Sequence, residues 1–485
     1  MVFAAGHMKS PASFFGHNFL KFNTGAVSGN SALLDETINY GADVPDNHGG
    51  LTYFYQGIFG GYSAVYERQP FFRHMAKYGE EDLRDVWEYE LNLSANEVEF
   101  IVAHAWELQQ VNLTYYFFRK NCAYQIARLL ALVTPEQLVP QYMPWTMPYN
   151  VFSALMQVQR NDESLVSGIY YHPSRRSRFH QRYFSLSAIE QQEFALQVTR
   201  KLDTDRLSEL DKQSQIRVTD ALIDYFEFRL RLDSEDKNAT ENKKTALLYR
   251  FSLPVADNVT SQFTQPFAPH RAQKPGYIGF SAVTNETLGK GAELRLRPAY
   301  FDFLSLDIGR SAAGEFTVLD TTLLFTENTL RLRRLDLLNV TNLAPSVTGI
   351  SGDTGASWLF RFGYNVADNA CTNCLRLMLE WQRGLSTRLN ATITGFLLAG
   401  GRLQGSVGLD QTLALKARTG LIGTLAPGLR LHAALERHEN TGRNGHDRNR
   451  IQFALRFGER ADWDIRLRYQ RDLVEEWSLT AGFYW

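Results

Sequence analysis

The chain has 485 residues and a formal net charge of −1, because 51 Lys and Arg nearly balance 52 Asp and Glu. Phosphate binding requires a basic surplus, so this balance argues against nucleic acid as the main partner. Apolar residues at 44% and charged residues at 21% exclude an extensively disordered chain, and the length allows for more than one domain.

The N-terminal segment, MVFAAGHMKSPASFFGH, lacks the basic stretch and following apolar stretch of a signal peptide. The Phe15-Gly16-His17 motif, our first candidate for function, already lies within this segment. We therefore interpret the chain as starting inside a domain, with a signal peptide missing, rather than as a cytosolic protein.

Residues 1–240 mix short strands with helical stretches. Residues 16–22 alternate between apolar and polar side chains, which predicts a strand, and residues 31–40 predict its partner. Ser94–Glu97 forms a capping box ahead of a helical run. This order of elements favours an α+β domain.

A second helix is expected to begin at Cys122, with Asn121 as its N-cap. Residues 185–232 also predict helices. The polar stretch DSEDKNATENKK, residues 233–244, predicts a solvated linker, and we place the boundary between the two halves of the chain there.

From Ala246 onward the hydrophobic period changes to two, with no helical pattern between the segments. Roughly a dozen strands of about ten residues indicate a closed antiparallel barrel with a polar lumen. These segments lie at 276–284, 292–300, 317–325, 328–338, 355–364, 374–383, 389–397, 412–419, 428–436, 451–457, 463–469 and 477–485.

A soluble β-sandwich or a lipocalin-like barrel is the alternative for this half. Its strands, however, are longer than the globular norm of about five or six residues. Trp485 also ends the chain on the outward phase of the last strand, which resembles the C-terminal signature of outer-membrane β-barrels. We therefore expect a membrane barrel in which the last strand pairs with an early strand at Ala246–Ser252.

Three cysteines are too few for a disulfide scaffold. Cys371 and Cys374 form a CTNC pair between two predicted strands, and they are either free or joined in a small disulfide loop. A zinc site would need two more ligands nearby, and none is visible. We expect no metal and no cofactor.

Cys122 and His17 are the candidates for chemistry. A thiol in the first turn of a helix feels the positive end of the helix dipole, which lowers its pKa. A nearby imidazole can take its proton, and the first amides can form an oxyanion hole. The order His before Cys is that of a circularly permuted papain-like fold. The alternative is that Cys122 is a small core residue.

Three ordered blocks of the sequence resemble the Lnb N-terminal periplasmic-domain family over about residues 1–170. They are SPASFFGHNFLKFN, FYQGIFGGYSAVYE and LRDVWEYELNLSANEVEFIVAHAWELQQVNLTYYFFRKNCAYQIARLL. That domain is similar to permuted NlpC-type peptidases and lecithin:retinol acyltransferase-like enzymes, and the family takes its name from a lipoprotein N-acyltransferase. The resemblance implies acyl transfer through a thioester, with Cys122 as nucleophile and His17 as general base. The second half resembles the C-terminal β domain of proteobacterial members.

A third residue should orient His17. Asn39, on the predicted partner strand, is our candidate, and Asp35 on the same face is the alternative. His104 is expected to be structural. Arg84 and Glu88 are expected to form an ordinary pair one helical turn apart, and we assign them no chemistry.

The substrate-binding candidates are Tyr62, Gly61 and Asn121. Tyr62 and the Gly60-Gly61 turn are expected to line the cleft, since paired glycines allow a ligand to approach the backbone closely. Asn121 lies directly before the nucleophile.

The sequence thus predicts a permuted papain-like, NlpC-type α+β domain at residues 1–170, a helical extension and linker at 171–244, and an outer-membrane barrel at 245–485. We expect a periplasm-facing thiol acyltransferase or hydrolase that acts on phospholipid or lipoprotein acyl groups. The alternatives are an NlpC-type amidase or peptidase on peptidoglycan, and a non-enzymatic barrel with a plug or docking domain.

Overall fold

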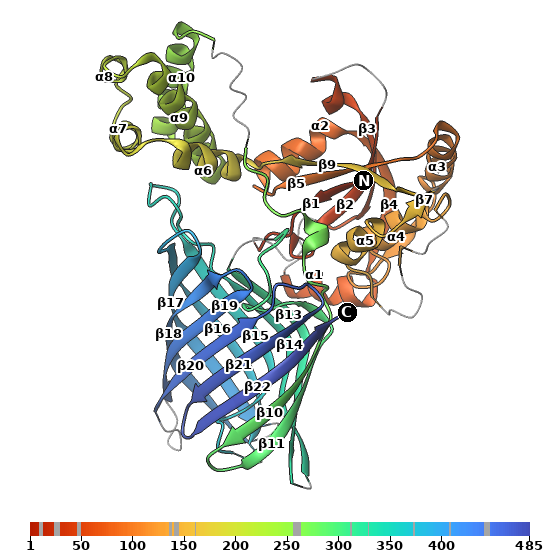
Figure 1. Ribbon diagram of the computed structural model, residues 1–485, viewed down its shortest axis with the longest axis vertical. Helices are drawn as coiled ribbons and strands as arrows, with labels where there is room; N and C mark the ends of the chain where they lie inside the picture. The colour runs from red at the N-terminus through yellow and green to blue at the C-terminus, as the bar shows by residue number, and fades with distance from the viewer. Residues whose placement is uncertain are drawn as a thin grey trace. The chain divides into compact units, whose positions relative to one another are not determined.

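The computed structural model describes residues 1–8, 13–23, 30–45, 50–134, 138–139, 145–160, 162–255, 263–310, 313–327, 329–371, 374–406, 409–440 and 447–485. Its contacts divide the chain into two compact units, drawn in Figure 1. The first contains Met1–His270 and Ile350–Gly352, and the second contains Arg271–Gly349 and Asp353–Trp485. None of the helices in the described ranges is long and apolar enough to span a membrane.

An antiparallel sheet is the centre of the first unit. Its described strands follow the order β6-β4-β3-β2-β1-β5-β9. Their bounds are β1 (Val2–Ala4), β2 (His17–Phe22), β3 (Glu36–Ala42), β4 (Tyr62–Pro70), β5 (Val86–Leu91), β6 (Leu113–Tyr115) and β9 (Val166–His172), and β7 (Gln159–Arg160) and β8 (Glu163–Ser164) form a separate small pair.

Helical segments cover both faces of this sheet. They are a 3-10 turn η2 (Asn30–Leu34), α1 (Gly50–Phe59), α2 (Phe71–His74), a π-helical segment η3 (Met75–Glu81), α3 (Ala95–Leu108), α4 (Cys122–Leu130) and α5 (Pro148–Leu155). The predicted strand at 31–40 therefore begins later, at Glu36, because residues 30–34 form the 3-10 turn. The capping box at Ser94 and Glu97 is present as predicted.

Alternate residues of a strand supply the two faces of a sheet. On one face, which we call the α2 face, the ring of Phe19 stacks on His74 of α2 at 4.0 Å and lies 6.2 Å from Tyr78 of η3. The other face carries α4, where the hydroxyl of Tyr66 donates to the carbonyl of Gln125 at 3.4 Å. We call this the α4 face.

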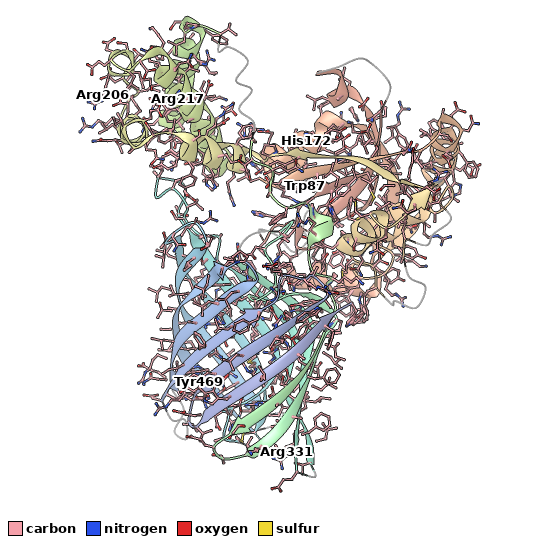
Figure 2. The ribbon with its side chains drawn as sticks, viewed as in Figure 1. Trp87, His172, Arg206, Arg217, Arg331 and Tyr469 are labelled. Carbon is pink, nitrogen blue, oxygen red and sulfur yellow. A yellow bond between two sulfur atoms is a disulfide. The ribbon has the colours of Figure 1, made fainter. Side chains whose placement is uncertain are left out.

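Five further helices form a bundle within the first unit: α6 (Arg175–Ser185), α7 (Ala188–Thr199), α8 (Thr204–Ser208), α9 (Lys212–Leu232) and α10 (Lys237–Ser252). Phe179, Phe194, Leu222 and Phe228 belong to its apolar core. Two of its arginines, Arg206 and Arg217, are labelled in Figure 2 and pair with Glu193 and Glu190.

The predicted linker at 233–244 is wrong for most of its length, because α10 occupies Lys237–Ser252. Asp236 caps this helix, and its side chain accepts a hydrogen bond from the Ala239 amide. Asn242 and Ala246 are buried on the side that packs against the bundle. The sequence pattern did not predict this helix, because the segment is polar and few apolar residues mark its buried face.

The second unit is a closed antiparallel barrel of twelve strands, in which β11 pairs with both β10 and β13. The strands are β10 (Tyr277–Asn285), β11 (Gly289–Arg297), β13 (Gly314–Thr326), β14 (Thr329–Asn342), β15 (Ala356–Val366), β16 (Leu375–Arg388), β17 (Ile393–Ser406), β18 (Leu409–Ala426), β19 (Leu429–Asn440), β20 (Arg448–Phe457), β21 (Trp463–Arg471) and β22 (Glu475–Tyr484). A short strand β12 (Ala299–Phe301) adds to β13.

The barrel is apolar outside and charged inside. Ile465, Leu479 and Phe483 are exposed on the outward phase, as the alternation predicts, whereas Asp464 and Arg466 are buried on the inward phase. A soluble protein would bury the apolar phase, so this arrangement is that of a membrane barrel.

The closing pair of the barrel differs from the prediction. The backbones of Trp485 and Gly276 hydrogen-bond to each other, and β22 pairs with β10 from Tyr277 onward. Residues 246–252, the predicted partner, belong to α10 instead. Cys371 and Cys374 are joined in a disulfide between β15 and β16.

Candidate active site

Asn121 fixes the start of the helix that carries Cys122. Its Oδ1 accepts a hydrogen bond from the Tyr124 amide at 3.1 Å. Its Nδ2 donates to the carbonyls of Phe117 at 2.9 Å and Thr146 at 2.7 Å. The predicted cap is therefore present. The same contacts occupy the side chain that we expected to bind substrate, so in this structure Asn121 positions the helix.

The Cys122 thiol lies against the sheet and is only 4% exposed. Its Sγ donates to Oδ1 of Asn18 at 3.7 Å, and it also hydrogen-bonds with Tyr115. Burial raises the pKa of the thiol, and this outweighs the hydrogen bonds that lower it. The predicted lowering of the thiol pKa is thus wrong, because desolvation is the larger effect.

His17 and Asn39 meet on the α2 face. The register pairs Phe19 with Asn39, which brings Asn39 beside His17, and the Nε2 of His17 lies 2.5 Å from Oδ1 of Asn39. An amide oxygen only accepts, so Nε2 carries the proton and the lone pair is on Nδ1. Burial lowers the pKa of His17 to about 3, so the imidazole is neutral at pH 7.

The structure brings His17 to Asn39 and Cys122 to Asn18, but it does not join the thiol to the imidazole. Adjacent residues of a strand point to opposite faces, so His17 and Asn18 diverge at the start of β2. Asn18 and Tyr115 were missed by the sequence analysis. The signal for Asn18 was its position directly after His17, on the phase that faces α4.

The alternative third residue, Asp35, has a different partner. It pairs with Lys21 at 3.4 Å, and Lys21 also binds Glu88 at 2.7 Å. Burial alone would raise the pKa of Glu88, but hydrogen bonds from His172 and Lys21 lower it to about 2. Glu88 lies on strand β5 rather than on a helix, so the predicted helical pairing with Arg84 is wrong.

Arg84 is a structural link between backbone segments. Its guanidinium donates to the carbonyls of Ala5 at 2.7 Å and Ala4 at 2.9 Å, and it lies over the ring of Tyr78 at 4.8 Å. It is buried within reach of both His17 and Cys122, and its charge lowers the pKa of each. Arg84 therefore favours a thiolate and disfavours an imidazolium.

The predicted cleft residues are closely packed. Tyr62 is 3% exposed and lies 5.9 Å from the ring of Tyr53. Gly60 has a φ of 87°, and a Cβ there would come within 2.4 Å of the Tyr116 ring. A Cβ on Gly61 would meet Gln56 at 2.7 Å. These glycines thus allow close packing of protein groups. His104 is at the surface, paired with Glu107 at 3.3 Å.

Helix α1 carries an exposed apolar surface and packs beside Phe117, in the segment that precedes Cys122. The Phe117 amide donates to the Gly57 carbonyl at 2.8 Å, and the ring of Tyr53 lies 4.7 Å from that of Phe117. On the outside of the same helix, Tyr55 and Phe59 are 66% and 68% exposed, with ring centroids 4.9 Å apart. Among the described residues, no group of three or more His, Cys, Asp or Glu has metal-binding geometry.

These features define a two-part envelope protein: an α+β domain with a buried cysteine, and an outer-membrane-type barrel. Residues 1–157 match the family described as the Lnb N-terminal periplasmic domain. Residues 266–485 match a domain of unknown function (DUF7840). No curated protein matches the chain. The protein is therefore anchored in the outer membrane and carries a domain of a periplasmic family.

Several solved outer-membrane structures are similar to part of the chain. The KdgM porin is 9% identical, with a TM-score of 0.28, and the match covers 43% of this chain and 99% of that one. The NanC porin is 10% identical, with a TM-score of 0.29, covering 43% and 98%. An outer membrane channel from Pseudomonas putida F1 is 14% identical, with a TM-score of 0.28, covering 48% and 100%.

Proposed function

We propose that the N-terminal domain is a permuted papain-like thiol acyltransferase or hydrolase that forms a thioester at Cys122 with lipid or lipoprotein acyl groups. The observation that carries this proposal is the position of Cys122. It lies in the first turn of a capped helix, against strand β2, which begins with His17, and the His17 imidazole is hydrogen-bonded to Asn39 on β3.

In this mechanism the Cys122 thiol and the His17 imidazole are both neutral before substrate binds. Nδ1 of His17 accepts the thiol proton while Sγ attacks the acyl carbonyl, and Oδ1 of Asn39 stabilises the imidazolium that forms. The first amides of α4 stabilise the oxyanion. His17 and Asn39 lie on the α2 face and the thiol lies on the α4 face, so this proton transfer requires the start of β2 to rearrange until Nδ1 reaches Sγ while Nε2 stays bonded to Asn39. The imidazolium then returns the proton to the alcohol oxygen of the donor, which leaves as the tetrahedral intermediate collapses to the thioester at Cys122. An amine, a hydroxyl or water finally attacks the thioester, takes the acyl group and releases the Cys122 thiol.

Helix α1 supports a lipid substrate. Its sequence, GLTYFYQGIF, has no charged residue, and its exposed Tyr55, Ile58 and Phe59 lie on the helix that packs beside Phe117. Each methylene of an acyl chain buried on an apolar surface contributes about 0.8 kcal/mol. The outer-membrane barrel on the same chain anchors the protein in a lipid bilayer, which is a source of acyl chains.

The test incubates the full chain in lipid vesicles with labelled phospholipid and, in parallel, with peptidoglycan fragments. We expect acyl release or transfer from the phospholipid, abolished in Cys122→Ser and reduced at least ~100-fold in His17→Ala, the scale of general base catalysis. His104→Ala is the matched control, because it removes a surface histidine of the same domain, and it should retain full activity. Turnover of the fragments alone would instead identify an amidase or peptidase.

A non-enzymatic envelope barrel with a docking domain is the second candidate. The observation that favours it is the thiol itself, which is 4% exposed and has a raised pKa. In that case neither substrate is turned over, and Cys122→Ser leaves the protein unchanged in every assay.

A further inference from the structure

The lumen of the barrel contains a cavity of about 200 Å³. Its walls come from strands on all sides, including Arg295 on β11, Lys416 on β18 and Arg466 on β21. A second cavity of about 90 Å³ shares several of these walls and reaches Asn369, after β15. Sites for drug-sized ligands have about 300–1,000 Å³, so an occupant here would be a small solute.

A described segment after β12, residues 302–310, crosses the lumen near one end. The Phe303 ring lies 5.2 Å from His432 on β19. Arg430 on the same strand donates to the Phe303 carbonyl at 3.3 Å and to Asp307 at 2.8 Å. In the strand order, β19 is six places from β13 in either direction, so this segment crosses the whole lumen. Phe303 also belongs to a buried apolar cluster with Leu343, Leu359, Phe396 and Ile422.

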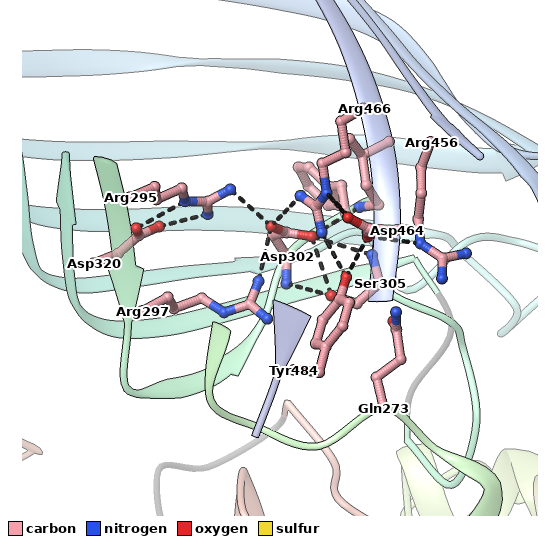
Figure 3. A network of polar contacts seen from close by, with 12 residues as sticks. Gln273, Arg295, Arg297, Asp302, Ser305, Asp320, Arg456, Asp464, Arg466 and Tyr484 are labelled. Carbon is pink, nitrogen blue, oxygen red and sulfur yellow. Dashed lines mark hydrogen bonds and ion pairs between the residues drawn. The ribbon is translucent and has the colours of Figure 1, made fainter. Parts of the chain in front are cut away.

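Charge holds the crossing segment in place, as Figure 3 shows. The Asp302 carboxylate binds Arg466 and Arg297, each at 2.8 Å, and Arg295 at 3.0 Å. The neighbouring Asp464 binds Arg456 at 2.9 Å. The carboxylate of Asp302 is thus already shared among three guanidinium groups.

The side chains that line the larger cavity include more cations than carboxylates, although carboxylates outside the lining, such as Asp320 and Asp472, pair with several of these cations. Eight Arg and Lys side chains line it, against five Asp and Glu. Among the described residues, the carboxylate that pairs with Arg418 belongs to Glu436 and lies 3.9 Å from Nε, whereas Nη2 contacts Nε2 of His432 at 3.2 Å. Arg418 Nε has no hydrogen-bond partner among the described residues.

Arg402 is a second buried guanidinium on an inward-facing position of β17. It is 2% exposed and sits directly opposite Glu380 in the β16–β17 register. Within the described part of the chain it has no ion pair, and its Nε and Nη2 have no hydrogen-bond partner. Buried guanidinium groups without partners are costly, and an anion in the lumen would offset that cost.

We propose that the lumen is a chamber that binds a small oxyanion, a solute with carboxylate or phosphate groups, through Arg418 and the surrounding cationic wall. A cationic side chain attracts such groups and forms charge-assisted hydrogen bonds with their oxygens. The crossing segment lies at the rim of Gly276 and Trp485, and at the opposite rim Asn369 donates to the Val474 carbonyl at 2.7 Å, so the anion is held between the two ends of the lumen.

Isothermal titration of the full chain in detergent micelles with citrate, and separately with inorganic phosphate, tests this proposal. We expect saturable binding of at least one probe, weakened about tenfold or more in Arg418→Gln and largely retained in Arg418→Lys. Arg402→Gln should also weaken binding. Arg383→Gln is the matched control, because Arg383 is exposed on the outward phase beside Trp381, and binding should not change.

Two results would overturn the proposal. One is the absence of binding heat with both probes at low ionic strength, where charge attraction is strongest. The other is equal weakening in Arg383→Gln and Arg418→Gln, which would place the anion on the outer surface. Retained binding in Arg418→Lys also shows that loss in Arg418→Gln reflects charge rather than misfolding.

Discussion

At the scale of single residues, the protonation of Cys122 and His17 decides how the site would work. Both groups are buried, which raises the pKa of the thiol and lowers the pKa of His17 to about 3. A preformed thiolate–imidazolium pair therefore does not exist at neutral pH. The chemistry depends on general base catalysis when substrate binds.

The pH dependence of Cys122 alkylation tests this protonation state. With its pKa above the ordinary value near 9, the thiol should react slowly with iodoacetamide at pH 7, and the rate should still rise above pH 9. Peptide mass spectrometry measures the rate, and Cys371 and Cys374 are protected by their disulfide. A rate that is already constant between pH 6 and 8 would reveal an ion pair and contradict this account.

The side chain of Asn121 permits a second residue-scale prediction. Asn121→Ala removes the cap and leaves two buried carbonyls without a donor, so α4 should open more easily by about 1–2 kcal/mol or more. Hydrogen exchange at Tyr124 and the following amides measures this opening. Asn121→Asp keeps the cap acceptor but turns a buried carboxylate oxygen toward the two carbonyls, so it should also ease the opening of α4. Unchanged exchange in Asn121→Ala would rule out the capping role.

At the scale of elements, α10 shows how a polar helix depends on its bundle. Ala246→Asp places a carboxylate in a site with no exposure, which should destabilise the helix by about 2 kcal/mol or more. Leu248→Asp, on the same helix at 63% exposure, is the control and should be nearly neutral. Faster hydrogen exchange in α9 and α10 is the expected readout. Equal effects of the two substitutions would mean that α10 is not packed as described.

The barrel strands were predictable and their connections were not. Alternation of apolar and polar residues is a local signal, and it located all twelve strands because the outward phase faces lipid along their whole length. The crossing segment at Phe303 depends on contacts with β19, more than a hundred residues later in the chain. Such long-range contacts leave no local period in the sequence.

The candidate site likewise contains one contact that the sequence can predict and one that it cannot. The pairing of His17 with Asn39 follows from two adjacent strands with matched register, which sequence alternation can predict. The contact of Cys122 with Asn18 depends on which face of the sheet α4 covers. Neighbouring strand residues differ only in phase, so a helix that packs on the other face selects Asn18 instead of His17.

At the scale of the whole molecule, the exposed apolar phase of the barrel predicts that lipid surrounds these strands. Leu479→Arg lies in the middle of β22 and should destabilise the barrel in vesicles by about 2–4 kcal/mol, whereas Phe483→Arg near the strand end should cost about 0–1 kcal/mol. Urea titration of the vesicle-inserted protein measures both. Equal and negligible costs would indicate that water, not lipid, surrounds these strands.

The central claim is that Cys122 carries an acyl thioester, and trapping that intermediate tests it most directly. The full chain is incubated in phospholipid vesicles, quenched in acid and examined by peptide mass spectrometry. We expect a fatty acyl adduct on the peptide that contains Cys122, removed by neutral hydroxylamine, absent in Cys122→Ser and more slowly formed in His17→Ala. An unmodified Cys122 in a protein that turns over phospholipid, or an adduct that persists in Cys122→Ser, would contradict the account.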